Sequence, residues 1–169
     1  ADTAARLERE GVPNYFDDQR FGSVSTEDQF IARAWLAGDH ERALWLALAA
    51  PNVHDRPDDR RTKEILRDHW NDWPACKAAL DRSHARSIVT YLVDHPTDHR
   101  RAFARLRREL RTLYFSAYQS HLWNLVLARL IHEITSPEQR VDFEFRMGPM
   151  PLVRDLDDAQ ADRLGSLRI

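Results

Sequence analysis

The chain contains few residues that interrupt a helix, and this scarcity constrains its fold more than any other feature. Only 5 glycines and 8 prolines occur among 169 residues. The tryptophans mostly sit at helical spacing with Leu and Ala, which is typical of core packing. Residues that cap or break helices divide the chain into segments. The pattern predicts a predominantly α-helical chain, with helices over 3–10, 27–37, 39–49, 59–70, 74–81, 84–94, 97–112, 116–134 and 156–167.

One segment follows a different period. In "VDFEFRMGPMPL", residues 141–152, Val141, Phe143 and Phe145 alternate with charged residues, which is typical of a β-strand. No other segment has a good strand pattern. The loop "PNVHDRPD", residues 51–58, is the best candidate for a linker between an N-terminal lobe and a helical lobe.

Composition excludes several classes of protein. Hydrophobic residues make up 43% of the chain and charged residues 31%, as in an ordinary soluble globular protein. No run of 18 apolar residues occurs, so we expect no membrane span. The single cysteine, Cys76, cannot form an intramolecular disulfide or a cysteine-rich zinc site. We expect an intracellular, cytoplasmic protein without a membrane partner.

The histidines do not form a metal site by their spacing. His121 and His132 share a helix face, but eleven residues place them about 16 Å apart, too far for one ion. His95 and His99 have Pro96 between them and no obvious carboxylate to complete a set. No phosphate-binding loop, dinucleotide glycine pattern or G-x-S-x-G sequence occurs. We therefore expect no metal and no cofactor.

Arginines concentrate in "HRRAFARLRRELRTL", residues 99–113. On a straight helix over 97–112, Phe103 and Leu106 fall on one stripe. Three arginines fall on the opposite one: Arg101, Arg105 and Arg108. They could bind the phosphates of RNA, or they could form a solvated face with salt bridges to neighbouring acids. The net charge of −2 does not exclude a local basic site.

Two further stretches carry unusual side chains. "GVPNYFDDQRFGS", residues 11–23, crowds aromatic and amide side chains into a turn, where exposed rings must pack or bind something. In "FSAYQSHLWNLVLARL", residues 115–130, Ser116 can cap a helix and Gln119 can complete a capping box.

Together the two stretches resemble the TruD family of RNA pseudouridine synthases. Residues 14–22 are similar to the family signature N-Y-[FY]-G-x-Q-R-F-G, and residues 116–124 to S-A-[YFR]-[QS]-S-x-[LF]-[FW]-N, with Arg129 matching a following arginine. The stretches lie in the family's order, and the resemblance covers the whole chain. Asp17 stands where the family usually has glycine. Because Asp tolerates the left-handed region, we expect the turn to form.

The resemblance implies a predominantly helical part of an α/β (α+β) pseudouridine synthase catalytic fold. Residues 1–50 would belong to the catalytic domain with the N-Y-F/Q-R-F-G loop. Residues 51–140 would be a helical region that ends in the S-A-Y-Q-S helix. Residues 141–169, with "FRMGPMPL", would be the start of the inserted domain typical of the family.

The resemblance also implies a cofactor-free isomerisation of uridine to pseudouridine in RNA, with tRNA as the expected substrate. The family's nucleophilic Asp lies in a G-x-K-D-x-x-A-x-T-x-Q motif that this chain lacks, since Lys63 precedes Glu64 and Lys77 precedes Ala78. The chain thus resembles an internal fragment of a synthase, with no catalytic residue of its own. We expect the isolated fragment to be inactive.

The resemblance assigns substrate binding to four residues of the first stretch: Asn14, Phe16, Gln19 and Arg20. Phe16 would stack on a flipped uridine, and the Asn14 amide would hold the nucleophile and a base edge. Gln19 and Arg20 would fix the loop or contact a phosphate. The alternative is a packed turn without such a role. For the whole chain, the alternative function is a non-catalytic helical module that binds RNA or an acidic protein through the arginines.

Overall fold

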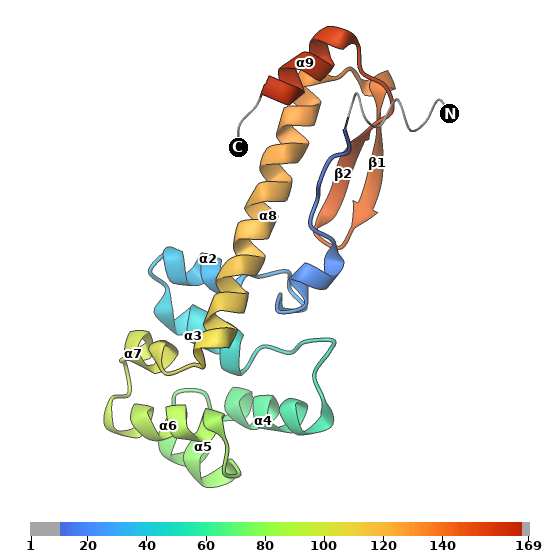
Figure 1. Cartoon of the computed structure of the whole chain (residues 1–169). Helices are drawn as coiled ribbons and strands as arrows, with labels where there is room; N and C mark the ends of the chain where they lie inside the picture. The colour runs from blue at the N-terminus through green and yellow to red at the C-terminus, as the bar shows by residue number, and fades with distance from the viewer. Residues whose placement is uncertain (1–10, 167–169) are drawn as a thin grey trace. The chain divides into compact units, whose positions relative to one another are not determined.

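Helices make up most of the described chain, as the scarcity of glycine and proline predicts. The computed structural model describes residues 11–166, and the helix predicted over 3–10 lies outside them. The predominantly helical fold class is confirmed, with one small antiparallel sheet (Figure 1). The elements in chain order are η1 (Asp18–Phe21), α2 (Ile31–Leu36), α3 (His40–Leu48), α4 (Pro57–Asp68), α5 (Trp73–Ala79), α6 (His84–Asp94), α7 (His99–Ala104), α8 (Arg108–Ile134), η2 (Pro137–Gln139), β1 (Arg140–Phe145), β2 (Gly148–Val153) and α9 (Asp158–Ser166).

Short polar side chains define where several helices begin. Before α3, α5, α6 and α7 the capping side chain accepts the N–H of the residue three positions later, which satisfies a donor that has no partner within the helix. The caps are Asp39, Asp72, Ser83 and Asp98. Between α2 and α3 the chain turns at Gly38, whose φ of +81° favours glycine.

The single helix predicted over 97–112 is wrong. Helix α7 ends at Ala104, and α8 begins at Arg108. The intervening turn is closed by a hydrogen bond from the Leu106 N–H to the Phe103 carbonyl, and both side chains are buried. No glycine or proline marks this turn. The turn allows α7 to pack against α3 and α6 while the chain changes direction into α8.

The helix start predicted at Ser116 is also wrong. Ser116 and Gln119 lie inside α8, so they do not form a capping box there. An interior position offers no free N–H group for the serine hydroxyl to accept, because the backbone donors already bond within the helix.

The chain divides into two compact units, here called the helical unit (Phe21–Tyr118) and the split unit (residues 11–20 with 119–166). The core of the helical unit joins α3 to later helices, with Leu44, Trp73, Leu92 and Phe103 all buried in one cluster. Residues 31–50 therefore pack with residues 66–106. These boundaries do not coincide with the predicted domain boundaries at 50 and 140, and the loop 51–58 lies inside the helical unit rather than between units.

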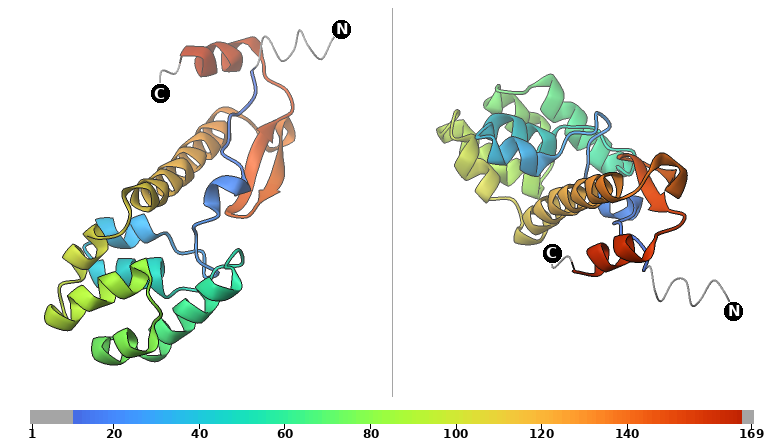
Figure 2. Two further views of the ribbon diagram at one scale, coloured as in Figure 1. Left: turned by 60° about the horizontal axis from the view of Figure 1, so that its bottom comes forward. Right: turned by 90° about the horizontal axis from the view of Figure 1, so that it is seen from above.

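The split unit combines the second part of α8 with a hairpin. Strand β1 confirms the predicted alternation and pairs antiparallel with β2, from Arg140 opposite Val153 to Phe145 opposite Gly148. Strand β2 was not predicted, because its two prolines argue against a strand. They are tolerated because each strand of a two-stranded sheet has a free edge. The segment 11–17 runs between the hairpin and α8 (Figures 1 and 2).

Candidate functional site

The aromatic loop, residues 14–20, folds around a local turn in the split unit. The Asp17 carboxylate accepts the Gln19 N–H at 3.0 Å, and the Asp17 carbonyl accepts the Arg20 N–H at 3.1 Å. The described residues with positive φ are Gly11, Asp28, Gly38, Asn71 and Gly148. The turn thus forms as expected, but Asp17 does not need the left-handed region. Its side chain stabilises the turn instead.

The side chain of Asn124, on α8, holds the loop at Phe16. Its Oδ1 accepts the Phe16 N–H at 2.9 Å, and its Nδ2 donates to the Phe16 carbonyl, also at 2.9 Å. Asn124 is only 1% exposed, so its amide is buried and both bonds are partly shielded from water. An amide carries a donor and an acceptor side by side, as a peptide group does, so it can pair with both backbone groups of an unpaired residue.

Two further side chains of α8 contact the loop from the same helix face. The Trp123 indole Nε1 donates to the Asn14 carbonyl at 3.0 Å, and the Arg20 Nε donates to the Ser120 Oγ at 3.0 Å. Positions 120, 123 and 124 are three and four residues apart, so they lie together on the helix surface. None of the three is among the predicted site residues, although the second family signature contains them all and could have indicated them.

The loop leaves a shallow hollow of about 390 Å³ lined by its own side chains: Tyr15, Phe16, Asp17, Gln19 and Arg20. The Phe16 side chain is 38% exposed although it is apolar. The Arg20 guanidinium carbon lies 5.5 Å from the centre of the Phe16 ring, within cation–π range. A flat apolar ring therefore lies beside a guanidinium that the Ser120 hydroxyl holds in place.

The far side of the loop is fixed by the hairpin. The Tyr15 hydroxyl donates to the Pro151 carbonyl at 3.0 Å, and the Tyr15 and Phe145 ring centres lie 6.0 Å apart. Burial, with a smaller effect of the Asp142 carboxylate, raises the pKa of the Tyr15 phenol above its ordinary value. Tyr15 thus stays protonated and remains a hydrogen-bond donor. The Asp18 carboxylate accepts the Arg146 N–H at 2.8 Å.

The four predicted substrate-binding residues fall into two places. Phe16, Gln19 and Arg20 line the hollow, whereas Asn14 lines a neighbouring hollow with Trp123. No described residue forms a hydrogen bond with the Asn14 side-chain amide, so it is available to a ligand. Direct substrate contact by these four residues stays a prediction.

The predicted arginine stripe does not form a single helix face. Arg101 lies in α7, Arg105 follows its end and Arg108 begins α8, because the chain turns between the two helices. Arg101 pairs with Asp98 at 3.6 Å. The Arg105 guanidinium lies 4.0 Å from the centre of the Tyr91 ring. RNA binding by these arginines stays a prediction, without the common face on which it was based.

The hollow beside Phe16 combines two groups that could bind a flipped base of RNA. An exposed aromatic face can stack on a base, and a fixed guanidinium can bind a phosphate or pack over the same base. Within residues 11–166, no group of three or more His, Cys, Asp or Glu side chains has the arrangement of a metal site. The same part of the chain contains no helix long and apolar enough to cross a membrane.

The chain is similar in sequence to a known family of proteins. The family model described as tRNA pseudouridine synthase D (TruD) matches residues 1–148. A protein of Methanococcus maripaludis named probable tRNA pseudouridine synthase D 1 is 29% identical over 158 residues, which are 91% of this chain and 40% of the relative. The tRNA pseudouridine synthase D of Aquifex aeolicus is 31% identical over 122 residues, which are 72% of this chain and 30% of the relative.

A third relative extends the comparison. The probable tRNA pseudouridine synthase D of Methanopyrus kandleri is 31% identical over 157 residues, 89% of this chain and 38% of the relative. The chain thus spans between 30% and 40% of the length of these three relatives. No solved structure matches the chain.

Proposed function

The chain belongs to the TruD family of tRNA pseudouridine synthases, and on this basis we propose that it acts in the isomerisation of uridine to pseudouridine in RNA. The proposed substrate is tRNA, and the proposed location is the cytoplasm. The aromatic loop would form one wall of the pocket that receives the flipped uridine. The enzyme would be an isomerase that needs no cofactor.

One observation carries the proposal: the bidentate pairing of Asn124 with the backbone of Phe16. It connects the two family signatures through two residues that are 108 positions apart in the chain. A buried amide used to hold one exposed phenylalanine indicates that the ring's position matters, since a ring that only fills a core needs no such support. A flipped base loses its stacking partners, and an aromatic face restores about 1–3 kcal/mol per base.

The proposed chemistry moves a bond without changing the oxidation state. The glycosidic bond from the ribose to N1 of uracil breaks, the base rotates, and a bond to C5 forms. C5 loses its proton and N1 gains one, so the product is an isomer of the substrate. The family's nucleophile is an Asp, and we assign this role to no described residue. Asp17 and Asp18 both accept backbone N–H groups within the site, which makes them structural.

Phe16, Gln19, Arg20 and Asn14 are proposed to bind the substrate. Phe16 would stack on the uracil, and Arg20 would contact a phosphate beside it. The Asn14 amide would hold a base edge or the nucleophile. Gln19 would contact RNA or support the turn.

Tritium release tests the proposal. The full-length protein is incubated with tRNA transcripts that carry tritium at C5 of uridine, because formation of the new bond at C5 displaces that hydrogen. We expect release in step with pseudouridine formation, and a large loss of both with Phe16→Ala. A folded full-length protein that binds tRNA and releases no tritium would contradict the proposal and favour a non-catalytic RNA-binding module.

A further inference from the structure

A further hollow, here called the α5–α6 hollow, lies in the helical unit where α5 leads into α6. Figure 1 labels these two helices. Its volume is about 330 Å³, and three cationic and three hydroxyl side chains line it: Lys77, Arg82, Arg86, Ser83, Ser87 and Thr90. No carboxylate and no large apolar side chain is among them. Nothing in the proposed uridine pocket involves these residues.

Hydrogen bonds fix the position of Arg86 in this hollow. The Arg86 Nε donates to the Lys77 carbonyl at 3.1 Å, which joins the first turn of α6 to the last turn of α5. The Ser83 Oγ accepts the Arg86 N–H at 3.2 Å, and the Thr90 hydroxyl donates to the Arg86 carbonyl at 2.8 Å. The terminal guanidinium nitrogens of Arg86 remain available, next to the Lys77 and Arg82 charges.

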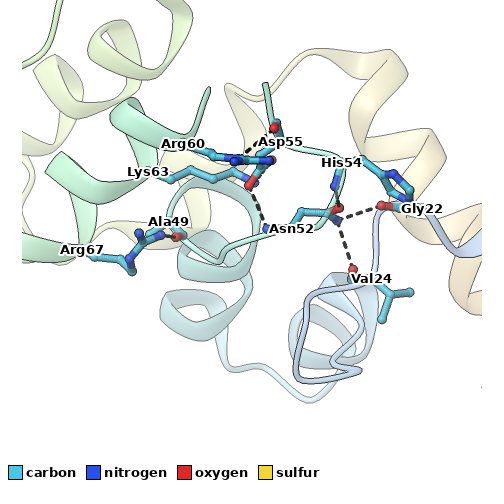
Figure 3. Close-up of polar contacts among 9 residues, drawn as sticks. All are labelled: Gly22, Val24, Ala49, Asn52, His54, Asp55, Arg60, Lys63 and Arg67. Carbon is cyan, nitrogen blue, oxygen red and sulfur yellow. Dashed lines mark hydrogen bonds and ion pairs between the residues drawn. The ribbon is translucent and has the colours of Figure 1, made fainter. Parts of the chain in front are cut away.

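Three other basic residues of the helical unit, on α4, are bound internally, as Figure 3 shows around Asp55. Lys63 pairs with the Asp55 carboxylate at 2.6 Å, and the Arg60 Nε donates to the Asp55 carbonyl at 3.0 Å. Arg67 donates to the Ala49 carbonyl at 2.7 Å. These cations stabilise the fold itself and are only partly available to a ligand.

The cations of the α5–α6 hollow differ from these three, because no carboxylate of the described residues holds them. In the described part of the chain, no carboxylate forms an ion pair with Lys77, Arg82 or Arg86. Three like charges around one hollow repel each other, and a bound anion would relieve this repulsion. The Ser83 and Ser87 hydroxyls can donate to the oxygens of a phosphate, and a guanidinium can bind two such oxygens.

We propose that this hollow binds a backbone phosphate of the RNA substrate. The choice of RNA rests on the proposed function, whereas the choice of a phosphate rests on the hollow alone. The hollow is shallow, so a phosphodiester within a longer strand can reach it. The contact would be independent of base identity, because phosphate contacts position RNA without reading its sequence.

The test compares two charge-matched double variants of the full-length protein. Lys77→Gln with Arg82→Gln removes two cations of the hollow and keeps Arg86, whose side chain joins α5 and α6. Arg33→Gln with Arg61→Gln removes two exposed cations of the same unit outside the hollow. Binding of a tRNA transcript is measured over a range of salt concentrations, and melting temperatures confirm that both variants fold.

We expect the hollow variant to bind tRNA roughly 3- to 20-fold more weakly at low salt. The slope of log K against log salt should fall by about 0.7–0.9, the contribution of one phosphate. In turnover, KM should rise while kcat is unchanged, since a distant phosphate contact is made equally in the ground and transition states. The control variant should keep the wild-type slope.

An unchanged slope in the hollow variant would overturn the proposal, and so would an equal fall in the control, which would show that only overall charge matters. The two proposals fail separately. If the wild-type protein forms no pseudouridine but the hollow variant loses one phosphate from its salt slope, the proposed function falls and the phosphate site stands.

Discussion

The side chain of Asn124 replaces a strand partner for Phe16, by accepting its N–H and donating to its carbonyl, each at 2.9 Å. The pairing fixes the loop's main chain and leaves the Phe16 ring free to meet a ligand.

The first prediction concerns this pairing. Asn124→Ala leaves the Phe16 N–H and carbonyl without their partners in a partly buried place, which costs about 1–3 kcal/mol for each group. We therefore expect the free energy of unfolding to fall by roughly 2–4 kcal/mol, measured by urea denaturation. Leu122→Ala, at a 43% exposed position on the same helix, serves as the control and should change stability by less than about 1 kcal/mol. Equal stability of the two variants would show that the pairing contributes little.

The second prediction separates binding from packing at Phe16. Because the ring is 38% exposed, Phe16→Ala should lower the melting temperature only slightly. If the ring stacks on uridine, catalytic efficiency of the full-length protein should fall roughly 5- to 150-fold, which corresponds to about 1–3 kcal/mol. Phe16→Tyr keeps the ring and should be far milder. A large fall in melting temperature with retained activity would remove Phe16 from the site.

The third prediction tests whether Ser120 positions Arg20. Arg20→Lys loses the Nε donor and the planar guanidinium, and Ser120→Ala removes only the acceptor. If Ser120 acts through Arg20, the double variant should bind tRNA no more weakly than Arg20→Lys alone. A coupling of about 0.5–1.5 kcal/mol is expected in the double-mutant cycle. Additive effects on tRNA affinity would instead assign the two residues independent roles.

The fourth prediction concerns the arginines around the turn between α7 and α8. Arg101 already pairs with Asp98, and Arg105 packs on Tyr91, whereas Arg108 has neither kind of contact in the described part of the chain. Changing each of the three to Gln should therefore affect the salt dependence of tRNA binding unequally. We expect Arg108→Gln to lower the slope by about one phosphate contact. A larger effect of Arg101→Gln than of Arg108→Gln would contradict this expectation.

The fifth prediction is that the 169-residue chain alone does not form pseudouridine. We expect no tritium release from C5-labelled tRNA, because no described Asp is assigned as the nucleophile. The full-length protein under the same conditions provides the positive control. Turnover by the chain alone would require a nucleophile within it.

Local signals in the sequence determined much of the fold. The residues that cap or break helices predicted the bounds of α3, α5 and α6 to within a few positions. The alternation at Val141, Phe143 and Phe145 predicted β1. These predictions succeed because caps and periodicity act between residues a few positions apart. The family signature likewise pointed to Phe16 and Arg20, because a sequence motif keeps its residues together along the chain.

Long-range packing decided the rest. The turn between Ala104 and Arg108 has no glycine or proline to announce it, and it forms because α7 packs against α3 and α6. Because of that turn, Arg101, Arg105 and Arg108 do not share one helix face. Likewise, the sequence identifies Ser120 and Asn124 as members of the second family signature, but it does not indicate what they contact. Only the folded chain brings Asn124 to Phe16, which is 108 positions away. The backbone groups of Phe16 need hydrogen-bond partners, and a local sequence pattern does not specify a partner so distant in the chain.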